Sequence, residues 1–288
     1  MVTKVLCVTK DDYDFIETYI VFYGTIFGYD NVIIIDNGST DKRVLDVYKN
    51  YPHIDLTVDP FPFLEASDHM ARHIMRYKGK CDWIVVADTD EYIFWEGDEV
   101  LDQEKIKNYI ESLPSQAHFG KVYASSVPYD AEFLHPAAEI TMFTESYMSK
   151  VIIKMDTFEG IILWPHHTNP SEQAHVTEGL QLLHFHNTGK KRHIERTLKF
   201  LKGCNYIEGT ESIEEQIYKC RFVVDSSANN FHRAQYYLDH LRGRAKPKFV
   251  ENTIEIKQVA NWFRRESIFP SRSQEPPSQN NSPAPQPF

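Results

Sequence analysis

The sequence predicts an α/β fold, with a GT-A-like (Rossmann-like), mostly parallel central sheet flanked by helices. Short apolar runs alternate with amphipathic segments along the first half of the chain. Polar or acidic clusters follow directly after those runs, which is where such sheets bind their ligands. The chain has 288 residues, of which 42% are hydrophobic and 13% aromatic. This composition is typical of a soluble globular protein and supplies enough apolar side chains for a large core.

Three strand–helix units and a fourth strand are expected between residues 2 and 87. The helix pattern is clearest in residues 13–27, where apolar side chains recur every three or four positions. The run NVIII is short and continuously apolar, as in a strand buried on both faces. Because strands and helices alternate, the crossovers should be right-handed and the strands parallel. The predicted strands are Val2–Val8, Asn31–Ile35, His53–Val58 and Asp82–Ala87, and the predicted helices are Tyr13–Phe27, Asp41–Tyr51 and Ser67–Tyr77.

The second half is less regular, and the end of the chain changes composition. Residues 269–288 are rich in Pro, Ser, Gln and Asn and nearly free of apolar side chains. Such a segment cannot bury enough surface to offset its ordering entropy, so it is predicted to be a disordered tail. Upstream of it, the predicted strands are Lys121–Val127, Val151–Met155 and Leu180–His186, and the predicted helices are Lys190–Lys202, Ser212–Lys219 and Asn252–Phe263.

Truncation after Pro270 is expected to leave the melting temperature and the activity unchanged, because the removed segment has no apolar run. Thermal denaturation of the truncated protein checks this expectation. A melting temperature lowered by several degrees would show that the tail packs on the fold.

Charge and cysteine content exclude several classes of protein. The formal net charge is −10, from 31 Lys+Arg and 41 Asp+Glu, which argues against a nucleic-acid binder because that needs a basic surface. The 4 cysteines form no C-x-x-C pair, which argues against a disulfide scaffold or a zinc ribbon. No transmembrane segment or signal peptide is recognised, so a cytoplasmic location is expected.

The acidic sequence from Asp88 to Glu91 (DTDE) is the strongest chemical signal. It directly follows a predicted buried strand, where repulsion between carboxylates is costly without a cation. In an extended segment residues i and i+2 share a face, so Asp88 and Asp90 can address one ligand. Carboxylate oxygens suit Mg²⁺ or Mn²⁺ that bridges phosphates. A solvated acidic turn is the alternative, and the preceding strand and the earlier segment IIIDNGSTD favour the metal.

With these segments the chain resembles nucleotide-sugar-dependent glycosyltransferases of the GT-A fold, and in pattern their family-2-like group with a D-x-D motif. The resemblance lies in VTKDDYDFIETYIVFYGTIFGYDNVIIIDNGSTD and CDWIVVADTDEYI, within residues 1–95. It implies inverting, metal-dependent transfer from a UDP-sugar donor to a hydroxyl of a glycan or glycoconjugate. It further implies a single catalytic domain over residues 1–268, with a nucleotide-sugar half at about 1–115 and an acceptor half at about 116–268.

The resemblance also implies the donor site. Asp36 would contact the base or ribose, while Thr9 and Lys10 would line the base pocket. The family usually has Asn-Glu where this chain has Lys10-Asp11-Asp12. An arginine one helical turn after Asp68 could face the nucleotide, or the two could form an i,i+4 surface pair. The predicted donor-binding residues are Thr9, Lys10, Asp36, Asn37, Asp68, Arg72, Asp88, Thr89 and Lys190.

A second cluster supplies a candidate metal ligand. Six of the 13 histidines lie between His166 and His193, and His184 and His186 project from one face of a predicted strand. The resemblance implies that a later histidine completes the coordination of Mn²⁺ or Mg²⁺. The predicted metal ligands are therefore Asp88, Asp90, His184 and His186, and the alternative is a pair of ordinary hydrogen-bonded histidines.

A general base is expected in the acceptor half, because an inverting transferase needs a carboxylate near the acceptor hydroxyl. Asp130 and Glu178 are the candidates by position alone. Two other functions stay open. A nucleotidyltransferase would normally carry a glycine-rich phosphate loop, and VTKDDYD is not one. A non-catalytic carbohydrate-binding protein on a transferase fold would not need the Asp-x-Asp sequence.

Overall fold

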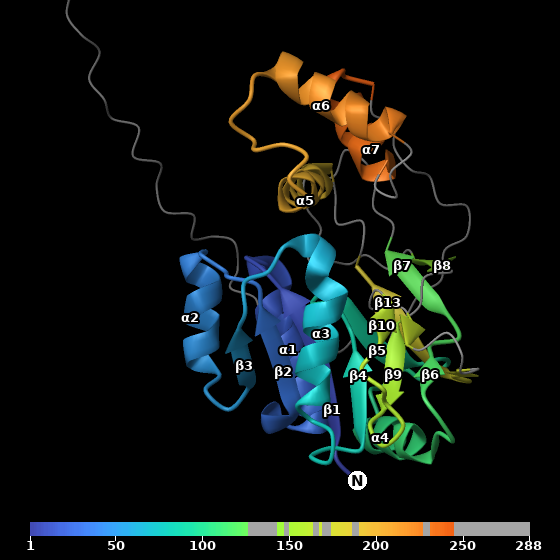
Figure 1. Ribbon diagram of the computed structural model, residues 1–288. Helices are drawn as coiled ribbons and strands as arrows, with labels where there is room; N and C mark the ends of the chain where they lie inside the picture. The colour runs from blue at the N-terminus through green and yellow to red at the C-terminus, as the bar shows by residue number, and fades with distance from the viewer. Residues whose placement is uncertain are drawn as a thin grey trace, which may run out of the picture.

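The computed structural model has an α/β body and a group of three helices above one edge of its main sheet (Figure 1). These two parts are called the body and the cap below. The structure describes residues 1–125, 143–146, 150–163, 167–168, 174–185, 190–226 and 231–244.

The main sheet is mostly parallel. Within the described residues it has seven strands in the order β12-β6-β9-β4-β1-β2-β3. The four strands β4, β1, β2 and β3 are parallel to one another, whereas β9 is antiparallel to both β4 and β6. Their bounds are β1 Thr3–Thr9, β2 Val32–Asp36, β3 Asp55–Val58, β4 Trp83–Val86, β6 Ala117–His118, β9 Val151–Lys154 and β12 His175–Val176.

A smaller sheet continues from the end of β4. In the described part of the chain its order is β5-β13-β7-β8, and β13 is antiparallel to β5. A short antiparallel pair, β10 with β11, forms a separate two-stranded sheet. The bounds are β5 Glu91–Trp95, β7 Val122–Ser125, β8 Phe143–Ser146, β10 Ile162–Leu163, β11 His167–Thr168 and β13 Leu180–His184.

Helices cover both faces of the main sheet. Successive strand side chains point to opposite faces, so in β2 Ile34 packs with the apolar face of α1 and Ile33 packs with α3 on the other side. All five residues of β2 are buried, as its continuous apolar run predicts. The helices of the body are α1 Tyr13–Phe27, α2 Lys42–Asn50, α3 Ala66–Met75 and α4 Gln103–Ser112, with 3₁₀ turns at Tyr29–Asn31 and Phe63–Glu65.

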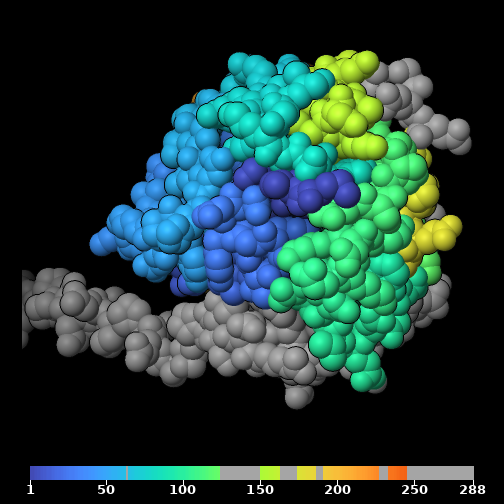
Figure 2. Space-filling model, turned by 90° about the horizontal axis from the view of Figure 1, so that it is seen from below, coloured from blue at the N-terminus to red at the C-terminus, as the bar shows by residue number. Residues whose placement is uncertain are grey.

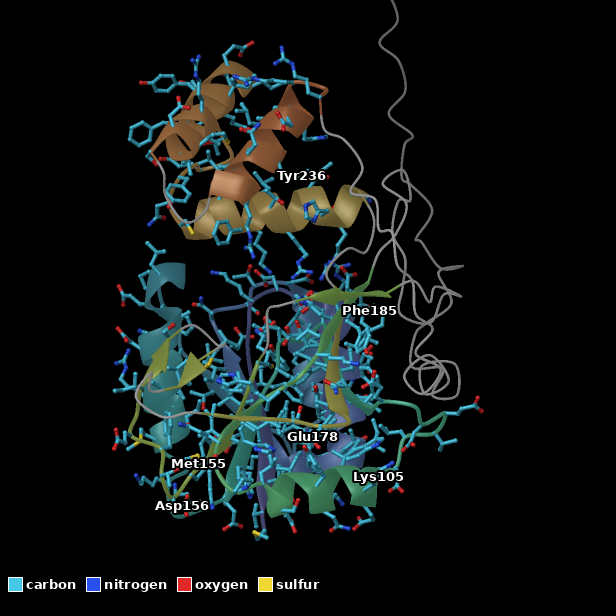
Figure 3. All side chains as sticks on the ribbon, turned by 90° about the vertical axis from the view of Figure 1, so that its right-hand side faces the viewer. Lys105, Met155, Asp156, Glu178, Phe185 and Tyr236 are labelled. Carbon is cyan, nitrogen blue, oxygen red and sulfur yellow. The ribbon has the colours of Figure 1, made fainter. Side chains whose placement is uncertain are left out.

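The cap consists of α5 Lys190–Gly203, α6 Ile213–Asp225 and α7 Phe231–Leu241. Its helices pack on one another through an apolar cluster that includes Leu201, Cys220 and Leu238 and is separate from the two clusters of the body. Because β1, β2 and β4 are parallel, their carboxyl ends share one edge, and α5 lies above that edge (Figures 1 and 3).

The amino ends of these strands lie at the opposite face, where the N-terminal residues are surrounded by neighbouring segments (Figure 2). A cavity of about 530 Å³ lies there, between the start of β4 and the end of α4. Of its lining residues, Asp82 accepts the Val2 N–H at 2.6 Å, and the terminal amine of Met1 lies 3.8 Å from Glu111. It is remote from the acidic turn, which follows the other end of β4.

The predicted α/β class with a mostly parallel central sheet flanked by helices is confirmed. All four strands and three helices predicted before residue 90 are present, with ends shifted by up to two residues. Strand β5, helices α4 and α7 and several short strands were not predicted. The four cysteines are buried free thiols, and no described helix is long and apolar enough to cross a membrane. The predicted helix Asn252–Phe263 and the tail lie outside the described residues.

Candidate active site

The acidic turn leads from the end of β4 into β5, at the edge beneath α5. Asp90 and Glu91 are each 2% exposed, whereas the side chain of Asp88 is 41% exposed. Three neighbouring carboxylates in such a place need positive partners, because unpaired buried charge is very costly. The structure supplies them from three distant parts of the chain.

The first positive partner is Lys150, which directly precedes β9 and is 1% exposed. Its Nζ lies 2.6 Å from Asp88 Oδ2 and 3.5 Å from Glu91 Oε2. Glu91 Oε2 also accepts the Asp88 N–H at 2.8 Å, which closes the turn. Burial raises the pKa of Glu91 to about 7, although Lys150 opposes the rise. Burial alone would lower the pKa of Lys150, and the carboxylates of Asp88 and Glu91 outweigh it and raise that pKa.

The second is His184 at the end of β13. The antiparallel register places it opposite Glu91, with its Nδ1 3.7 Å from Glu91 Oε1 and its Nε2 3.5 Å from Asp90 Oδ2. Burial would lower the pKa of His184, but Asp90 outweighs burial and raises it. The structure therefore brings together the predicted residues Asp88, Asp90 and His184.

The third is a row of cations on α5. Arg192, Arg196 and Lys199 recur at four- and three-residue spacing, so they share one helix face. Arg196 Nη1 donates to Asp90 Oδ2 at 2.6 Å. Arg192 pairs with both Asp12 and Asp14, and Lys199 Nζ donates to the carbonyl of Lys10. The cap is thus fixed to the acidic edge by charged contacts.

The loop after β1 is tied to the loop after β2 and to the acidic turn. Asp11, at a positive φ of 49°, accepts the N–H groups of Thr40 and Asp41 at 2.6 and 2.7 Å. Asp12 Oδ2 accepts the hydroxyl of Thr89 at 2.5 Å. The sequence Lys10-Asp11-Asp12, which departs from the pattern of the resembled family, therefore connects three loops of the site.

The residues predicted to bind the nucleoside, Thr9, Asp36 and Asn37, lie close together at the ends of β1 and β2. Much of their hydrogen bonding is to other groups of the protein. Asp36 is 1% exposed, and its Oδ1 accepts the Ser39 N–H at 2.5 Å across a turn that contains Gly38 at a φ of 74°. The Asn37 N–H donates to the carbonyl of Thr9 at 2.8 Å. Asn37 Oδ1 accepts the Phe61 N–H at 2.7 Å. These groups set the shape of the edge between β1 and β2.

Asp68 and Arg72 do not form the side-chain ion pair on α3 that was one of the two alternatives for them. Arg72 Nε donates instead to the backbone carbonyl of Asp68 at 3.4 Å. The polar link between α3 and the sheet is made by Asp59, whose Oδ2 lies 2.8 Å from both His69 Nδ1 and His73 Nε2. Hydrogen bonds from these two histidines lower the pKa of Asp59.

Glu178, one of the two predicted general-base candidates, lies away from the acidic turn. It is exposed in the turn before β13, where its N–H donates to Tyr109 Oη at 2.7 Å. Phe185, directly after His184, marks the other end of this strand in Figure 3. A five-residue strand spans roughly 17 Å, so Glu178 and Asp90 lie at opposite ends of β13. Asp130 and His186 lie outside the described residues, as does the side chain of Lys190.

A divalent cation was predicted here, and the donor atoms suit one. Asp90 Oδ2 and His184 Nε2 are 3.5 Å apart, near the roughly 3 Å that separates adjacent ligands of an octahedral ion. Across the described residues, no three His, Cys, Asp or Glu side chains are arranged as a preformed metal site. The physical reason for this absence is that Lys150 and Arg196 bind the oxygens of Asp88 and Asp90 that such an ion would use.

Comparisons with known proteins agree with a transferase. The class is glycosyltransferase, since the family model described as glycosyltransferase family 92 matches residues 13–242, from the start of α1 to just beyond α7. The chain belongs to glycosyltransferase family 92. The predicted enzyme class, a glycosyltransferase, is thus confirmed. No curated protein matches the sequence.

Three solved structures resemble the chain distantly. The structure of S. aureus TarS shares 11% identity, covering 85% of this chain and 43% of its own, with a TM-score of 0.35. HddC from Yersinia pseudotuberculosis shares 12%, covering 64% and 93%, with a TM-score of 0.35. A cytidylyltransferase from Leptospira borgpetersenii serovar Hardjo-bovis shares 10%, covering 59% and 68%, with a TM-score of 0.33. Scores this low carry no information on function.

Several residues of the site were not predicted. Arg196 and Lys199 had a signal, since they share one face of a predicted helix with Arg192 in an otherwise acidic protein. Asp12 was noted only as a departure from the pattern of the resembled family. Lys150 had no local signal, because a single lysine before an apolar run is typical of a surface position.

Proposed function

We propose that the protein transfers a sugar from a nucleoside-diphosphate sugar, UDP-linked, to a hydroxyl of a glycan or glycoconjugate, with inversion and with Mn²⁺ or Mg²⁺. The observation that carries this proposal is the convergence of Asp88, Asp90 and His184 at one turn, next to the cations of α5. Membership of glycosyltransferase family 92 supplies the reaction class. The UDP-linked donor, the metal and the inversion are parts of this proposal.

Each part of the site has a chemical task in this reaction. A bound divalent ion would supply positive charge to the departing diphosphate, and Asp88, Asp90 and His184 would hold that ion. Glu91 faces the other nitrogen of His184 and would orient the imidazole ring. Lys150 fixes the carboxylates of Asp88 and Glu91 in the turn.

The remaining elements would hold the donor and the acceptor. The edge formed by Thr9 and the turn from Asp36 to Ser39 would receive the nucleoside. The cap would cover the diphosphate and exclude water from the reacting bond. Asp130 stays the prediction for the carboxylate that takes the proton of the acceptor hydroxyl.

A thermal-shift panel of nucleotide sugars, with and without Mn²⁺, tests this function. A ligand at 100 times its dissociation constant stabilises the folded state by about 2.7 kcal/mol, a clear shift in melting temperature. UDP-sugars are expected to stabilise the protein more with Mn²⁺ than without it, and other nucleotides less. Glycan binding without a response to any nucleotide sugar, and without transfer, would favour the non-catalytic carbohydrate-binding alternative.

Asp36→Ala is expected to weaken UDP binding by roughly 1.5–3 kcal/mol, the scale of a hydrogen bond to a charged group. The substitution removes both the charge and the acceptor for the Ser39 N–H. Calorimetry measures the affinity, with the exposed Asp46 changed to Ala as a control. Asp36→Asn separates the two causes, because it keeps an acceptor for Ser39 and loses only the charge. Unchanged UDP affinity in Asp36→Ala would remove this residue from the site.

His184→Ala is expected to weaken Mn²⁺ binding at least about tenfold in the presence of UDP, the lower end of the effect of residues that support a metal. UDP binding without metal should change far less, since His184 faces Asp90 and Glu91. His175→Ala, on the outer strand β12, is the control. Full Mn²⁺-dependent turnover in His184→Ala would contradict the assignment, and damage in His186→Ala instead would move the ligand two residues along.

A further inference from the structure

One oxygen atom of the acidic turn has two competing uses. Asp90 Oδ2 accepts a hydrogen bond from Arg196 Nη1 at 2.6 Å, and the same oxygen lies 3.5 Å from His184 Nε2. An ion held between Asp90 and His184 would need this oxygen. The side chain of Asp90 is only 3% exposed, so there is little room for the guanidinium and an ion at once.

The position of Arg196 allows its side chain to leave Asp90 without unfolding the body or the cap. Its side chain is 33% exposed, and it belongs to α5, whose apolar residues pack within the cap. Besides the contact of Arg196, the side-chain contacts described from α5 to the loop after β1 and to the start of α1 are ionic, polar or cation–π, and they come from Arg192 and Lys199. Such contacts can exchange partners, whereas the apolar clusters on either side stay intact.

We propose that Arg196 is a built-in competitor for the cation at Asp90, and that it transfers to the diphosphate of the donor when cation and donor bind together. This inference rests on the proposed function. A guanidinium that leaves Asp90 needs a new anion, and the oxygens of a nucleoside diphosphate offer the paired geometry it prefers. Arg192 and Lys199 lie on the same face of α5 and add to the positive charge there.

The consequence is cooperative binding. Without UDP, Asp90 Oδ2 is bound to Arg196 in most molecules. The apparent affinity for the cation is then the intrinsic affinity multiplied by the fraction of molecules in which this oxygen is accessible. When UDP is present, Arg196 has an alternative partner and the oxygen is released. Cation and UDP must therefore strengthen each other's binding by the same factor.

Binding of Mn²⁺ to the wild type, Arg196→Gln and Arg192→Gln, followed by electron paramagnetic resonance of the free ion, tests this. Without UDP, Arg196→Gln is expected to bind Mn²⁺ at least about tenfold more tightly than the wild type, the scale of one charge-assisted hydrogen bond. The factor by which UDP strengthens Mn²⁺ binding should fall by a similar amount in Arg196→Gln. Arg192→Gln is the matched control, since it frees Asp12 and Asp14 but leaves the Arg196–Asp90 contact, and should show no gain in Mn²⁺ affinity without UDP.

Equal Mn²⁺ affinity of the wild type and Arg196→Gln without UDP would overturn the competition. If the wild type then still bound Mn²⁺ with UDP, and Asp90→Asn abolished that binding, the proposed function would stand and only this inference would fail. No Mn²⁺ binding by any variant, with or without UDP, would overturn both.

Hydrogen exchange of the wild type provides a test that needs no variant, should Arg196→Gln not fold. Saturating Mn²⁺ alone is expected to speed amide exchange in α5, because it displaces Arg196, and Mn²⁺ with UDP is expected to slow it. Peptides from the buried strand β2 serve as the internal reference, since they belong to the body's core. Exchange in α5 that does not respond to Mn²⁺ would overturn the inference.

Discussion

Asp90→Asn is expected to lower kcat/KM by at least about a thousandfold, equivalent to roughly 4 kcal/mol of lost transition-state stabilisation. Asn has the shape of Asp but not its charge, and it offers one acceptor oxygen where the carboxylate offers two. Asp90 is nearly fully buried between His184 and Arg196, so water cannot replace the lost charge. The variant should still fold, because the change is nearly isosteric.

Steady-state transfer from the donor identified by the thermal-shift panel measures this effect, with Mn²⁺ in excess. Asp14→Asn is the matched control, since Asp14 also receives an arginine of α5 but lies outside the acidic turn. Weaker attachment of the cap would affect both variants, whereas loss of an ion ligand would affect only Asp90→Asn. Full Mn²⁺-dependent turnover in Asp90→Asn would assign the ion to other residues.

The sheet and its flanking helices could be predicted because their signals are local. The first four residues of β2 are all apolar because helices cover both faces of the sheet, and the apolar face of α1 repeats every three to four residues. The start of α2 was also readable, since Asp41 accepts the Arg43 N–H at 2.9 Å as an N-cap. Each of these features depends on neighbours along the chain.

The partners of the acidic turn could not be predicted, because they come from far along the chain. Strand β5 begins with Glu91, so its first residue was interpreted as part of an acidic turn. Its pairing with β13 places His184 opposite Glu91, and no local pattern states that register. Glu178 shows the same limit, since position in the second half does not tell which end of β13 a residue flanks.

Lys150→Met is expected to lower the free energy of unfolding by about 3–5 kcal/mol, the cost of removing one partner from a buried charge pair. Met keeps most of the apolar stem, so the loss comes from the ammonium that lies between Asp88 and Glu91. Without it, the carboxylates of Asp88 and Glu91 lie close together and lose the cation that contacts both of them. Urea denaturation measures the effect.

Two companion variants identify its cause. Lys105→Met removes a half-exposed pair with Asp98, so it should cost less than about 1 kcal/mol. Lys150→Met combined with Glu91→Gln should recover part of the stability, because neighbouring groups couple by about 0.5–3 kcal/mol. A single Lys150→Met variant as stable as the wild type would mean that Asp88 and Glu91 do not depend on this lysine. Recovery in the double variant would show that Lys150 stabilises the turn by compensating the charge of Glu91.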